Sequence, residues 1–167
     1  MIGNRMEEAL NEQINEELFS AYLYLAMAAY FHGEGLDGMA RWMRLQAKEE
    51  VEHALKIFDH LVERGGKVTL RALKEPQGGW ESPLAAFRAA YEHERHITGR
   101  IHELVELAQA EKDHAAFQML SWFVAEQVEE EDQTRKAVEL LERVGDSGHG
   151  LIMIDRELGT RTEGKEE

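Results

Sequence analysis

Four long stretches of this chain carry apolar residues at helical spacing and contain almost no glycine or proline. They cover residues 6–31, 37–64, 83–110 and 114–143 of the 167. The first stretch runs into Gly33 and Gly35 and the second into Gly65, where glycine readily adopts the left-handed conformation that ends a helix. Ser82 and Asp113 can cap the third and fourth stretches through their side-chain oxygens. The pattern predicts four long helices and disfavours a β-sandwich or barrel.

The connection between the second and third predicted helices, residues 67–81, is long for a loop and has no helical period. A link of this length can cross from one end of a bundle to the other. After the fourth helix, a short apolar segment at about 149–158 predicts a fifth helix, and the charged residues 160–167 predict a flexible tail. We therefore expect a single all-α domain over residues 1–167. The bundle covers about 6–143, with a long crossover between helices two and three and a short fifth C-terminal helix.

Charge and cysteine content narrow the classes of partner. The 33 acidic and 19 basic residues give a formal net charge of −14, which disfavours nucleic acid because such binders cluster Lys and Arg against phosphates. The absence of cysteine excludes disulfides and Cys-ligated metal sites, and it leaves carboxylates and imidazoles as metal ligands. No segment reaches the ~20 apolar residues of a membrane span, and the N-terminus lacks the apolar stretch of a signal peptide. We expect a cytoplasmic protein with no membrane partner.

Polar side chains interrupt the apolar stripe of each predicted helix. At about 100° per residue, Glu50 and His53 lie on the stripe marked by Met43 and Ile57. The stripes of the other three helices hold Glu17, Glu94, Gln127 and Glu130. An unpaired ionised carboxylate in an apolar core costs several kcal/mol, so several of them together require compensation. A bound cation would supply it.

These polar residues also fall at one depth of the predicted bundle. Residues equidistant from a turn face one another in an antiparallel helix pair, and the midpoint between Glu17 and Glu50 lies in the turn at 33–35. The midpoint between Glu94 and Gln127 likewise lies in the link before Asp113. Both intervals are 33 residues, and adding 77 maps the first pair onto the second. Carboxylate oxygens with one imidazole suit iron or manganese, and zinc also fits.

The motifs around these positions resemble those of the bacterial and archaeal non-haem ferritins. The resemblance covers nearly the whole chain and rests on Glu17, Glu94, the segment KEEVEHA at 48–54 and the segment EQVEEE at 126–131. It implies a ferritin-like four-helix bundle. Bacterioferritins carry a haem-ligating Met beside the second-helix Glu, where this chain has Val51, so no haem is expected. Rubrerythrins typically carry a Cys-rich module, which is absent here, and mini-ferritins lack a fifth helix.

The resemblance also implies a di-iron centre with ligands from all four helices. Glu17, Glu50 and His53 would bind the first iron ion. Glu50 would bridge to a second iron ion held by Glu94 and Glu130. The side chains assigned to the centre are Glu17, Glu50, His53, Glu94, Gln127 and Glu130.

Further positions carry family roles at the edge of this centre. The family's third iron site would map to Glu49, Glu126, Glu129 and Glu130. Tyr24 matches the tyrosine beside the family's centre, and a core aromatic residue with a satisfied hydroxyl is an equal alternative for it.

Three functions remain open at this point. The first, implied by the resemblance, is iron storage with ferroxidase activity: Fe(II) is oxidised by dioxygen and stored as Fe(III) mineral in a homo-oligomeric cage, with 24 subunits in the family. The second is a di-iron peroxidase or oxidase that consumes peroxide or dioxygen without storing mineral. The third is a scaffold bundle whose metal ion is structural, which predicts metal-dependent folding without iron turnover.

Overall fold

The computed structural model describes residues 1–163, and it folds them into five helices and no strand. The helices are α1 (Asn4–Gly33), α2 (Asp37–Glu63), α3 (Pro83–Ala110), α4 (His114–Val144) and α5 (Gly148–Leu158). The predicted all-α bundle with a fifth helix is therefore confirmed. The predicted helix ends differ from the observed ones by at most two residues, and Ser82 and Asp113 cap α3 and α4 as expected. Part of the predicted tail, residues 164–167, lies outside the described residues.

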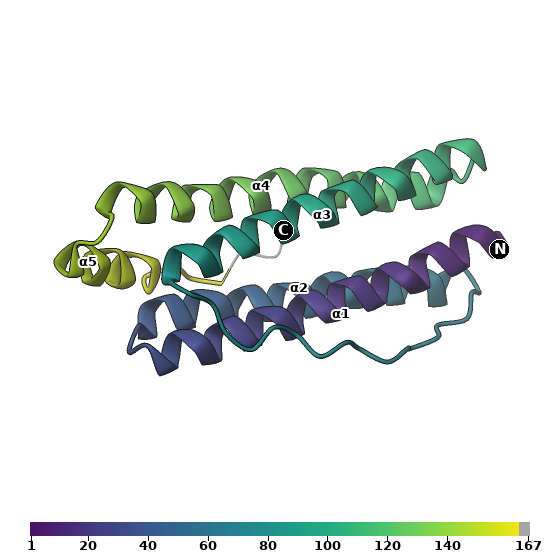
Figure 1. The fold of residues 1–167 in the computed structure, drawn as a ribbon. Coiled ribbons are helices and arrows are strands. Elements are labelled where there is room, and N and C mark those ends of the chain that lie inside the picture. The colour runs from purple at the N-terminus through teal and green to yellow at the C-terminus, as the bar shows by residue number, and fades with distance from the viewer. Residues whose placement is uncertain (164–167) are drawn as a thin grey trace.

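The four long helices form two antiparallel pairs, α1 with α2 and α3 with α4, and the crossover runs along the length of the bundle (Figure 1). Asn11 holds the start of the crossover, because its side chain donates to the Lys67 carbonyl at 2.8 Å and accepts from the Thr69 amide at 2.7 Å. Near the other end, the Trp80 ring packs edge-on against Tyr30, with ring centroids 5.6 Å apart. The long link is thus anchored to α1 at both ends.

The apolar core is divided into two clusters by a polar layer. One cluster lies near the α1–α2 turn and includes Phe31, Met43 and Phe87, and the other lies near the α3–α4 turn and includes Leu10 and Ile57. Every long helix contributes to both clusters, and between its two contributions each helix carries the predicted polar residues. The structure thus confirms that the polar residues of the four helices lie at one depth of the bundle, as their distances from the turns predicted.

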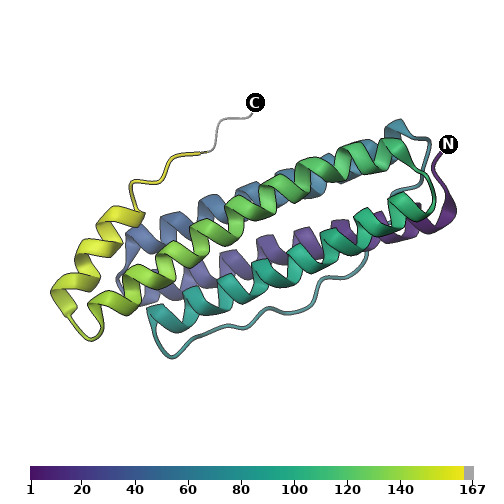
Figure 2. The ribbon, with the colours of Figure 1, turned by 90° about the horizontal axis from the view of Figure 1, so that it is seen from above.

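α5 closes the end of the bundle at which α2 begins (Figure 2). A Cβ atom at Gly38 would lie 1.8 Å from the backbone oxygen of Asp155, so only glycine allows this approach of α2 to α5. The Met39 amide donates to the Asp155 side chain at 2.8 Å and fixes the same contact. The docking of α5 on α2 directs residues 159–163 toward α2.

Candidate metal centre

The polar layer places carboxylates from all four long helices around one point in the core. Its six residues are each at most 4% exposed: Glu17, Glu50, His53, Glu94, Gln127 and Glu130. The helical spacing explains the convergence, because Glu50 and His53 are one turn apart on the buried face of α2, and Gln127 and Glu130 are one turn apart on that of α4. The structure thus brings together the residues that the sequence assigned to the two-metal centre.

Two groups of three ligands share Glu50. Ligand atoms of Glu17, Glu50 and His53 lie within 4.8 Å of one another, and so do those of Glu50, Glu94 and Glu130. A carboxylate has two oxygens, so Glu50 can serve both groups at once. The arrangement has the ligand number and chemistry for two adjacent divalent cations.

The first group leaves coordinating atoms free of hydrogen bonds. Glu17 Oε1 accepts from the Gln13 amide at 2.8 Å, whereas Glu17 Oε2 and His53 Nδ1 have no hydrogen-bond partner among the described residues. These two atoms lie 4.0 Å apart, and His53 Nδ1 lies 3.3 Å from Glu50 Oε2. Buried polar atoms are rarely left unpartnered, so lone pairs converging on one space fit a cation between them.

Burial raises the pKa of three carboxyl groups of the layer, those of Glu50, Glu94 and Glu130. Burial, with a contribution from the charge of Glu17, raises the pKa of Glu94 to about 7. Burial, with the charge of Glu94, raises the pKa of Glu130 to about 8, and the same two causes raise the pKa of Glu50 well above its ordinary value. The negative charge of Glu50 raises the pKa of His53 against the opposing effect of burial. A metal ion that binds here must therefore displace protons.

Neutral donors orient the carboxylates. The Tyr24 hydroxyl donates to Glu94, and the Gln127 side-chain amide donates to the same carboxylate at 3.2 Å. The Gln46 amide donates to Glu50 at 3.2 Å and also to Glu130. In this structure Gln127 acts as a hydrogen-bond donor to a ligand. Gln46 has no predicted role, although its place on the α2 stripe four residues before Glu50 signals burial beside the centre.

The residues assigned to a third iron site are only partly gathered. Glu126 joins His53 and Glu130 in a third group of ligand atoms within 4.8 Å. Glu49 is turned to Arg161, whose guanidinium donates to it at 2.6 Å, and Glu129 is exposed. Among the described residues, neither Glu49 nor Glu129 belongs to a group of metal-ligand atoms. Burial raises the pKa of Glu49, and the adjacent guanidinium opposes that rise.

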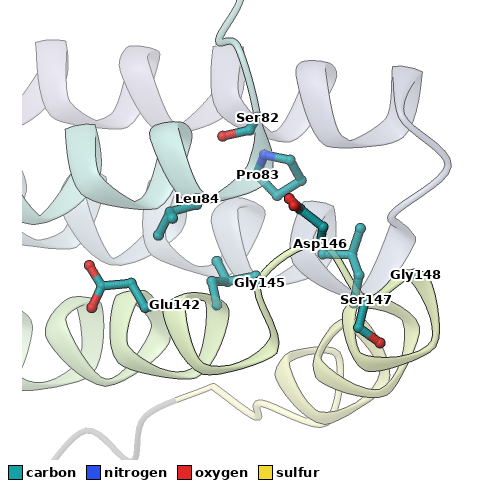
Figure 3. A pocket seen from close by; sticks show the side chains of 10 residues that line it. Ser82, Pro83, Leu84, Glu142, Gly145, Asp146, Ser147 and Gly148 are labelled. Atoms are coloured by element: carbon teal, nitrogen blue, oxygen red, sulfur yellow. The ribbon is translucent and has the colours of Figure 1, made fainter.

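A separate pocket of 310 Å³ lies where α3 begins and α4 turns into α5 (Figure 3). Its lining includes Pro83, Leu84, Leu141, Gly145 and Leu151, and it contains none of the predicted ligands. Among residues 1–163, the three groups of candidate metal-ligand atoms all include residues of the polar layer, and none of them includes a residue that lines this pocket.

The fold and the polar layer together define a four-helix bundle whose buried carboxylates and one imidazole could hold two metal ions. The ferritin-like domain family matches residues 7–144. The chain belongs to the ferritin family.

Relatives from bacteria and archaea agree along almost the whole chain. It is 42% identical over 161 residues to the bacterial non-heme ferritin of Bacteroides fragilis, covering 96% of this chain and 100% of the relative. The non-heme ferritin of Staphylococcus aureus MRSA252 is 40% identical, with 97% and 98% covered. The open pore ferritin of the hyperthermophilic archaeon Archaeoglobus fulgidus superposes with a TM-score of 0.96 at 53% identity, covering 97% of this chain and 100% of that one. Among residues 1–163, no helix has the length and apolar character needed to span a bilayer.

Proposed function

We propose that this protein stores iron and oxidises Fe(II), its substrate, at the buried carboxylate layer. The observation that carries the proposal is the pair of three-ligand groups that share Glu50 and lie between two apolar core clusters. Burying so many carboxyl groups is unfavourable unless a cation binds among them, and membership of the ferritin family supplies the identity of that cation.

Each group would hold one Fe(II) ion. Glu17, Glu50 and His53 would hold the first, and Glu50 with Glu94 and Glu130 the second. The two ions would together supply two electrons to one dioxygen molecule, and the carboxylates would neutralise the higher charge of the Fe(III) ions that result. The protein positions the two iron ions, supplies the negative charge of the carboxylates and keeps water out of the buried site. None of its side chains has to act as a nucleophile.

Storage requires an assembly with a cavity. We infer a homo-oligomeric cage of 24 subunits in the cytoplasm, as the family relationship suggests, with dioxygen or peroxide as oxidant. The third iron position, formed by Glu126, Glu129 and Glu130 with Glu49, would receive ions on their way to the cavity. The support for it in this chain is the proximity of Glu126 to His53 and Glu130.

Aerobic Fe(II) loading followed by sedimentation tests the proposal. The expected product is a large, iron-dense particle that sediments faster than the unloaded protein. A small iron-poor species that still consumes peroxide would instead indicate a di-iron peroxidase. Helical structure that depends on metal, without Fe(II) turnover, would indicate a structural metal site. The matched control is the Glu50→Ala/Glu94→Ala variant, which should assemble but lose the fast oxidation phase.

A further inference from the structure

The segment after α5 contacts α2 beside the metal centre. Arg161 is its main contact: the guanidinium donates to the Gln46 side-chain oxygen at 2.8 Å and to Glu49 at 2.6 Å. Its Cζ atom also lies 4.5 Å from the centre of the Trp42 ring, within cation–π range. Two residues on, Glu163 forms an ion pair with Lys48 at 2.8 Å. Four contacts with α2 thus dock this segment, which we call the C-terminal arm (residues 159–163).

The Arg161 side chain is well buried for a charged group, with 13% exposure, and Glu49 is 20% exposed. A guanidinium held this far from water between a carboxylate and an aromatic face makes a stronger ion pair than an exposed one. The charge is therefore a fixed feature of the site edge while the arm is docked.

Only one side chain, that of Gln46, lies between Arg161 and the candidate metal ligands. Because the guanidinium binds the Gln46 oxygen, the Gln46 amide nitrogen faces inward, where it donates to Glu50 and Glu130. Arg161 thus occupies the cation position at Glu49 and is connected through a single side chain to the carboxylates of the second metal position.

We propose that Arg161 is a positioning residue that acts as the resident cation of Glu49, so that a third metal ion binds at the site edge only when the C-terminal arm leaves. The inference rests on the proposed function, since it concerns the same centre. With the arm docked, Glu49 is neutralised by a group that cannot be deprotonated, and a metal ion at Glu49 would have to displace it against charge repulsion. The docked arm thereby separates the two inner metal positions from the edge position.

Anaerobic titration with Zn(II), by calorimetry and by anomalous diffraction of loaded crystals, tests this assignment. The wild-type protein should bind two ions per subunit tightly and a third weakly. Arg161→Gln should bind the third ion more tightly by about tenfold or more, because the competing charge is gone. Arg161→Lys keeps the charge and should resemble the wild type. Arg156→Gln removes one positive charge from an exposed position in α5 and serves as the matched control.

The location of the gained ion is decisive. Adding Glu49→Gln to the Arg161→Gln variant should abolish the gain, and the anomalous peak should lie beside Glu49. Equal third-ion affinity in the wild type and Arg161→Gln, or a gain that survives loss of Glu49, would overturn the role of Arg161 while leaving the two-metal centre intact. Absence of the first two ions in every variant would instead overturn the proposed function and this inference with it. Helical content and assembly size, measured on each variant, show whether Arg161→Gln folds. Arg161→Ala also removes the guanidinium charge and gives a second test of its role.

Discussion

Metal binding should be strongly pH-dependent between pH 6 and pH 8. Glu94 and Glu130 have pKa values raised to about 7 and about 8 in the metal-free protein, chiefly by burial. A raised carboxyl pKa means that the proton is held in the empty site and must leave before an oxygen can bind a cation. The metal affinity therefore falls as the pH drops through these two pKa values, and it levels off once the pH is above both.

The size of the effect follows from the two pKa values. At pH 6 both carboxyls are ionised together in about one molecule in a thousand, and at pH 8 in about half of the molecules. The affinity of the metal position formed with Glu50 should accordingly rise on the order of 10²-fold or more over this range. At pH 6.5, binding should release at least one proton for each ion in this position.

Zn(II) is the suitable probe because it undergoes no oxidation. Competition with a chelator at pH 6 and pH 8 gives the affinities, and calorimetry in buffers of different protonation enthalpy gives the number of protons released. Glu130→Gln removes one titrating ligand, so it should weaken binding at pH 8 and flatten the pH dependence to about tenfold. Glu52→Gln, on the outer side of α2, should change neither quantity. Equal affinities at the two pH values without proton release would show that the carboxyls are already ionised, and the argument from burial would be wrong.

Three further outcomes are expected. Glu50→Ala should slow Fe(II) oxidation, measured by stopped-flow absorbance, by at least about tenfold, and Glu52→Ala should not. The reason is that Glu50 is shared by two ligand groups, whereas Glu52 faces away from them. Equal oxidation rates in the two variants would contradict the assignment. The protein expressed with excess haem should show no Soret band, since Val51 offers no axial ligand, and stoichiometric haem would refute this. Gly38→Ala should lower the free energy of unfolding by about 1–3 kcal/mol in thermal unfolding, because the added Cβ would overlap the Asp155 backbone. Gly99→Ala is the control and should cause no such loss, because its Cβ would meet open space. Similar losses in the two variants would count against close packing of α5 on α2.

The architecture and the depth of the polar layer could be predicted because both depend on local sequence patterns. Apolar spacing and helix-ending glycines set the limits of the helices, and the short turns near Gly35 and Lys112 fix which residues of each pair lie opposite one another. Once Glu17 faces Glu50, and Glu94 faces Gln127, the convergence of the two pairs follows from burying all four stripes in one core. The division of the core into two apolar clusters is the consequence of that geometry.

Contacts that depend on how separate elements dock could not be predicted. Arg161 lies 115 residues from Gln46 in the sequence, and the two meet only because α5 docks through Gly38 and directs the C-terminal arm along α2. His93 is a similar case: it is largely buried and pairs with Ser20 on α1 at 2.7 Å, and burial lowers its pKa to about 4. No spacing rule singles out either side chain, because the partner belongs to another element.

The chemistry of the donors around the centre explains how the layer can remain open to cations. Among the described residues, none of the fully buried side chains is Lys or Arg, and the groups that donate to the carboxylates are the neutral Gln13, Gln46, Gln127 and Tyr24. A buried guanidinium would neutralise the carboxylates permanently and compete with a divalent ion, whereas an amide or hydroxyl orients an oxygen without cancelling its charge. In the part of the chain that the structure describes, the one arginine that hydrogen-bonds to Gln46 is Arg161, which reaches the network from its edge. The permanent positive charge of Arg161 thus lies on the C-terminal arm, which can leave the site. The negative charge of the buried carboxylates is then balanced by protons or by metal ions.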